Sequence, residues 1–141
     1  MATALAILAF ALTPSAAKAQ SFTGKYPVLE TQVLAGFAGN IKGGNESFCL
    51  MLTDDGSIGR PHSGPATLES LGGGGSFSGT FQVIGKMILA NFEVGSDTGE
   101  VEGLVLVAPA SSGKIGTTGV MGLAGGVPSS GLATVGTKNG C

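Results

Sequence analysis

Acidic side chains gathered around one turn are the first candidates for chemistry. They are Glu93, Asp97, Glu100 and Glu102. Paired carboxylates can perform general acid–base catalysis, as in glycoside hydrolases, or can bind a metal ion through their oxygens. Glu100 and Glu102 are two residues apart, so in a strand both point to one face, opposite Val101. Because a solvated strand face has this same pattern, we assign neither a catalytic residue nor a metal ligand to the cluster.

The single histidine, His62, is the second candidate. Together with Ser63 and either Asp54 or Asp55, it supplies the residue types of a Ser-His-Asp triad. The G-x-S-x-G motif of a nucleophile elbow, however, occurs nowhere in the chain. A histidine directly after Pro61 is typical of a solvated loop. The sequence therefore predicts no catalytic residue, metal or cofactor. The alternative function is an acid–base enzyme (hydrolase or isomerase) that uses the carboxylates or His62.

The two cysteines, Cys49 and Cys141, are the remaining reactive side chains. An even number of cysteines in an exported chain favours one disulfide, which would join the C-terminus to the strand around Cys49. The alternative is that Cys49, between Phe48 and Leu50, is a small buried hydrophobic residue and Cys141 is a free thiol.

The clearest structural element around these residues is a hairpin in Ser76–Val94. Its first half alternates apolar with polar residues, which predicts a strand, and Gly85-Lys86 fits a two-residue type II′ turn. One face of the hairpin carries large apolar side chains. These would line a ligand cavity or form the core, and they are Phe77, Phe81, Val83, Ile88 and Phe92.

Further strands are predicted on both sides of the hairpin. Glu100–Val107 follows a second turn and ends before Pro109, and Ile58 starts a short strand before Arg60-Pro61. The other predicted strands are Ser47–Thr53, Gln32–Phe37, Lys114–Val120 and Leu132–Thr137. Short strands separated by glycine-rich turns indicate an all-β fold, namely a small antiparallel up-and-down barrel or sandwich of about seven or eight strands. We favour the barrel because closure removes exposed strand edges.

The first nineteen residues differ from the rest, since all 26 glycines come later. Ala2–Leu12 is an apolar run, broken by Pro14, and Ala17-Lys18-Ala19 fits a cleavage site. This layout predicts a cleavable signal peptide over 1–19 and a single glycine-rich β domain over 20–141, although no positive charge precedes the run. A buried N-terminal helix is the alternative. The run is too short to span a membrane as a helix.

Composition narrows the function further. Only 11% of the residues are charged and the formal net charge is −2, which argues against a nucleic-acid partner. We therefore expect a secreted or periplasmic, non-enzymatic β module that is structural or surface-associated, or that binds a small apolar ligand. Edge-to-edge self-association of the strands, which carry little charge, is a further hypothesis.

Overall fold

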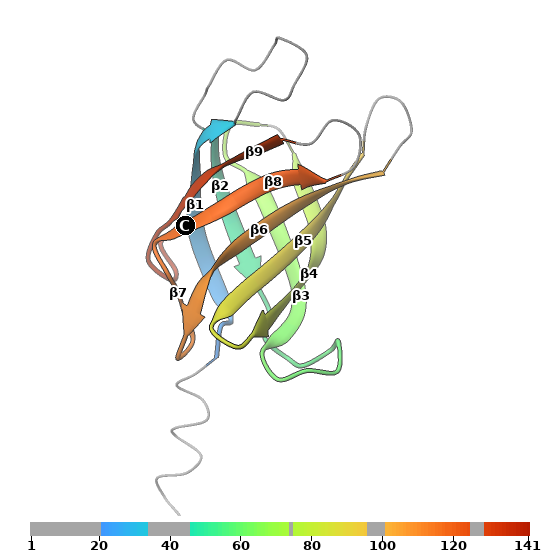
Figure 1. The fold of residues 1–141 in the computed structure, drawn as a ribbon, viewed down its shortest axis with the longest axis vertical. Coiled ribbons are helices and arrows are strands. Elements are labelled where there is room, and N and C mark those ends of the chain that lie inside the picture. The colour runs from blue at the N-terminus through green and yellow to red at the C-terminus, as the bar shows by residue number, and fades with distance from the viewer. Residues whose placement is uncertain (1–20, 34–45, 74, 96–100, 125–128) are drawn as a thin grey trace, which may run out of the picture.

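The computed structural model describes residues 21–33, 46–73, 75–95, 101–124 and 129–141. All regular structure in these residues is β-strand (Figure 1). The strands are β1 (Gly24–Val33), β2 (Glu46–Leu52), β3 (Ser63–Ser70), β4 (Ser76–Ile84), β5 (Met87–Gly95), β6 (Val101–Ser111), β7 (Lys114–Ile115), β8 (Thr118–Ala124) and β9 (Ser129–Val135).

These strands form a closed antiparallel barrel of eight strands, with the two-residue β7 attached to β6. Each strand pairs with the next one along the chain, except that β6 pairs with β8 past the short β7. Pairing of β9 with β1 then closes the ring. The prediction of an up-and-down barrel is thereby confirmed. Below, the lower end is where β1 begins and residues 53–62 lie, and the upper end is where β1 finishes (Figure 1).

The predicted hairpin is present as β4 and β5, with Gly85 at φ +60° in the connecting turn. That φ value is the one a type II′ turn needs at its first central position, and glycine reaches it without strain. Predicted strand Ser47–Thr53 corresponds to β2, and Leu132–Thr137 corresponds to β9. Alternation and turn chemistry therefore located these elements correctly.

Three predicted boundaries were wrong. Ile58 lies in a loop and is 41% exposed, and the strand in this region is β3, which begins at Ser63. The predicted strand Lys114–Val120 is divided between β7 and β8. β6 continues through Pro109 to Ser111 instead of stopping at Val107.

Proline is tolerated inside β6 because of where the neighbouring ladder ends. The carbonyl of Pro109 accepts a hydrogen bond from Gly116 N at 2.7 Å, so this side of the residue faces the segment before β8. The β6–β8 ladder itself ends at the pair Val107–Val120, so the missing N–H of Pro109 removes no bond from it. Of the predicted strand Gln32–Phe37, Gln32 and Val33 belong to the end of β1, and the remainder lies outside the described residues.

The inward faces of the strands fill the barrel with side chains. An eight-stranded barrel has an interior just wide enough for this. One continuous cluster of buried apolar residues results, and its members are Phe22, Tyr26, Val28, Phe48, Leu50, Leu52, Ala66, Leu68, Phe81, Ile88, Ala90, Phe92, Leu104, Leu106, Ala108, Ala110, Met121, Ala133 and Val135.

Candidate functional site

The five residues predicted to line a cavity lie on the wall formed by β4 and β5. Phe81, Ile88 and Phe92 are 1%, 0% and 1% exposed, and Phe77 and Val83 are partly buried against the same cluster. Side chains with so little accessible surface are enclosed by other atoms on almost every side. In this conformation these three residues therefore contact other side chains, as core residues do.

An open pocket of about 290 Å³ lies at the lower end, beside the C-terminal segment. Its floor is made by Tyr26 and Val135, which point into the barrel and are almost fully buried. The other lining residues come from β7, from the segment just before β8 and from the C-terminal segment, namely Lys114, Ile115, Thr117, Gly136, Thr137 and Lys138. The lining thus combines buried apolar side chains with two lysines, Lys114 and Lys138.

Phe22 covers the lower end of the core, and both of its backbone polar groups are bonded. Its N–H donates to Asp54 Oδ2 at 2.9 Å, and its carbonyl accepts from the Tyr26 hydroxyl at 2.8 Å. Burial, followed by the negative charge of Asp54, raises the pKa of Tyr26 to about 12. Tyr26 therefore remains a neutral hydrogen-bond donor at ordinary pH.

His62 and Asp54 form the only pair of a triad that the structure assembles in the described part of the chain. His62 Nδ1 lies 2.8 Å from Asp54 Oδ2, and the imidazole ring contacts Phe22 edge to face. The hydroxyl of Ser63 is fully buried and donates to the carbonyl of Arg60. Because Asp54 also accepts from Phe22 N, the pair anchors the segment before β1. Because the Ser63 hydroxyl is directed to Arg60, Ser63 is not placed as the nucleophile of a triad.

A second polar group, not foreseen from the sequence, lies at the upper end, where Glu30 is buried and Glu46 is exposed. Glu30 and Glu46 are directly opposite each other on β1 and β2, and Ser70 Oγ donates to Glu46 Oε1 at 3.3 Å. Burial, and secondarily the charge of Glu46, raises the pKa of Glu30 above its ordinary value of 4.5. A buried carboxyl group with a raised pKa is a candidate for a general acid. For metal binding, the described residues contain no cluster of three or more side chains that could hold an ion.

The carboxylates around the predicted turn are only partly described. Glu93 is exposed on the outer face of β5, and Glu102 lies in β6 opposite Val94 of β5. Asp97 and Glu100 lie outside the described residues. The solvated-face interpretation therefore fits Glu93, and the rest of the cluster stays a prediction.

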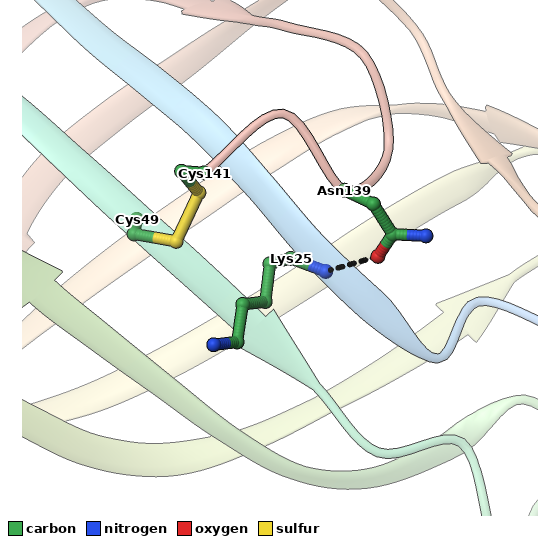
Figure 2. Close-up of a disulfide and its surroundings, with 4 residues drawn as sticks. All are labelled: Lys25, Cys49, Asn139 and Cys141. Carbon is green, nitrogen blue, oxygen red and sulfur yellow. Dashed lines mark hydrogen bonds between the residues drawn. A yellow bond between two sulfur atoms is a disulfide. The ribbon is translucent and has the colours of Figure 1, made fainter.

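Cys49 and Cys141 form a disulfide, which settles the alternative left open by the sequence (Figure 2). Cys49 lies on the outer face of β2. Residues 136–141 reach it by running along the part of β1 before Val28, which β9 does not cover. In this segment Gly136 N donates to the Pro27 carbonyl at 2.7 Å, and Asn139 Oδ1 accepts from Lys25 N at 3.3 Å. We call residues 136–141 the C-terminal strap.

The fold and these sites together define a closed eight-stranded meander barrel with an apolar interior and a disulfide-bonded strap. Among the described residues, no helix is long and apolar enough to span a membrane. Comparison with protein-family models, curated protein sequences and solved structures found no match for this chain.

Proposed function

We propose that the chain is a secreted or periplasmic, non-enzymatic structural barrel that works through its outer surface. The observation that carries this proposal is the filled interior. Residues from opposite walls, such as Leu50, Ile88 and Leu106, have no accessible surface, so the described core offers a ligand no space without rearrangement. The Asp54–His62 pair is engaged in holding Phe22, which supports a structural role for the residues that most resemble a catalytic site.

Export is supported by the disulfide and by the leader-like first nineteen residues. Disulfides persist in oxidising compartments such as the periplasm and the extracellular space, and are rare in the cytosol. The Cys49–Cys141 bond therefore supports an extracytoplasmic location. The signal-peptide hypothesis adds an independent reason for the same location.

Native mass spectrometry of the protein produced with its leader in an exporting host tests the proposal. We expect a mass that begins at Gln20 and is lighter by two hydrogens, with nothing bound. An uncleaved Met1 would contradict export. A co-purifying small molecule would instead identify a carrier and remove the structural proposal.

The lower-end pocket favours a second candidate function, the binding of a small apolar ligand. Tyr26 is the only tyrosine, the chain has no tryptophan, and Tyr26 forms part of the pocket floor. Its near-ultraviolet circular dichroism is therefore a local reporter. Titration with 1-octanol that saturates this signal and raises the melting temperature would support the candidate, and an unchanged signal would remove it.

A further inference from the structure

The outer surface over β5, β6, β8 and β9 carries a continuous apolar row. Leu89 pairs with Val107, Val107 with Val120, and Val120 with Leu132, so the four side chains follow one another across four strands. Val120 and Leu132 are 51% and 55% exposed. With strands about 4.8 Å apart, the row is about 14 Å long. Together with Met87, Val105 and Pro109 around it, we call this surface the outer band.

The outer band differs in polarity from most of the outward face of β4, the strand next to β5. Among the described outward side chains of β5, β6, β8 and β9, Glu93 is the only charged one. The outward side chains along most of β4 are instead hydroxyl or amide groups, namely Ser76, Ser78, Thr80 and Gln82, whereas Ile84 at its end is 49% exposed and pairs with Met87. Continuous exposed apolar surface on a protein marks an interaction site.

Charges are separated between the two ends of the barrel. The described basic residues all lie at the lower end, and they are Lys25, Arg60, Lys86, Lys114 and Lys138. The described acidic residues lie at the upper end, apart from Asp54 and Asp55, and they are Glu30, Glu46, Glu69, Glu93 and Glu102. This arrangement puts Lys86, in the turn before β5, just below the outer band and puts Glu93, near the end of β5, above it.

We propose that the outer band binds a second copy of this chain, with the two-fold axis running along the apolar row. Rotation about that axis sets the strands of the two copies antiparallel. Residues on the axis then meet their own counterparts, which uncharged Val120 and Leu132 allow and a charged side chain would oppose.

The charge pattern of β5 fits the same axis. Leu89 lies about midway between Lys86 and Glu93 in sequence, and it is part of the apolar row. Rotation about the row therefore brings Lys86 of each copy opposite Glu93 of the other. Attraction at these two rim positions selects the antiparallel arrangement, because a parallel one would place like charges together.

Sedimentation velocity over a range of protein concentrations tests the dimer, with Val120→Lys as the disrupting variant. We expect the native chain to form a concentration-dependent dimer and Val120→Lys to raise its dissociation constant at least about tenfold, since two lysines would face each other on the axis. Thr67→Lys adds the same charge to the outer face of β3, the strand opposite β8 in the ring, and should dimerise like the native chain. A native chain that remains monomeric, or equal effects of the two variants, would overturn the proposal.

A charge exchange tests the orientation without altering the apolar row. Glu93→Lys and Lys86→Glu should each weaken dimerisation about three- to tenfold, because each places like charges opposite one another. The double variant restores opposite charges and should regain most of the native affinity. Additive weakening in the double variant would exclude this axis. Binding of a monomeric native chain to phosphatidylcholine vesicles, lost in Val120→Lys, would assign the outer band to lipid and also overturn the proposal.

Discussion

Phe81 lies at the centre of the wall that the sequence already singled out, and its side chain is 1% exposed. Replacing it with alanine removes a buried aromatic ring and leaves a cavity among close-packed neighbours. We expect Phe81→Ala to lower the free energy of unfolding by about 3–5 kcal/mol. Val120→Ala, which truncates a half-exposed outer side chain, should change it by less than about 0.5 kcal/mol. Urea denaturation of both variants measures this difference, and similar losses would argue against a packed interior.

Glu30 provides a pH-dependent test at the same scale. Its raised pKa means that the folded protein binds this proton more tightly than the unfolded chain does. The contribution of protonated Glu30 to the free energy of unfolding is therefore complete below the ordinary pKa of 4.5. It is lost as the pH rises through the higher pKa of Glu30 in the folded protein. The glutamine in Glu30→Gln cannot ionise. The melting temperature of this variant minus that of the native chain should therefore be higher at about pH 7 than at about pH 4. Glu69→Gln, an exposed outer-face control, should lack this trend.

At the scale of elements, the C-terminal strap is held by one covalent bond and a few hydrogen bonds. The disulfide joins residues 92 positions apart, so breaking it frees a long loop in the unfolded chain. The double variant Cys49→Ala/Cys141→Ala should lose about 2–4 kcal/mol of stability. Asn139→Ala leaves the disulfide intact and removes one hydrogen bond of the strap, so it should lose about 1 kcal/mol. Equal losses would mean that the disulfide contributes no more to stability than this one hydrogen bond does.

Gly79 tests how closely β4 and β5 approach each other. A Cβ atom built at this position would lie 1.7 Å from the Asn91 carbonyl oxygen and 2.9 Å from Phe92 Cα, and backbone atoms cannot move aside cheaply. We expect Gly79→Ala to cost at least about 1–3 kcal/mol. Gly85→Ala fills open space but requires a positive φ, so it should cost about 1 kcal/mol through the backbone alone. Thermal unfolding ranks the two variants, and the reverse order would contradict the close strand contact.

The hairpin was predictable because its signals are local, whereas β3 was not. Phe77 and Phe81 alternate with serine and threonine, and Gly85 provides the turn. In β3 the buried positions include Gly64, Ala66 and Ser70, which carry too little apolar surface to produce a pattern. These small residues are adequate in the structure because the phenylalanines of β4 pack beside them, and that complementarity depends on pairing between strands.

The candidate sites divide in the same way. The disulfide could be predicted because the chain offers only two cysteines. The contact of His62 with Asp54 could be noted from residue types, but its anchoring of Phe22 depends on a loop and a segment 32 residues apart along the chain. Similarly, Glu30 and Glu46 carry no sequence signal as a pair, because only the β1–β2 register places them opposite each other.

At the scale of the whole molecule, closure makes the barrel one cooperative unit. Every ladder strand of the barrel has partners on both sides, and the buried side chains form one cluster. We expect the near-ultraviolet signal of Tyr26 and the far-ultraviolet strand signal to change in a single coincident transition. Separate transitions would indicate that the lower end around Phe22 unfolds independently of the walls.

The pairing of β9 with β1 also fixes the order of events while the chain is being made. Every other barrel ladder joins strands that follow one another, so these ladders can form while the rest of the chain is still being made. The ring cannot close until residue 135 has followed, and until then β1 presents an unpaired edge to neighbouring nascent chains. Slow delivery of the last strand should therefore lower the yield by aggregation, even when the finished barrel is stable.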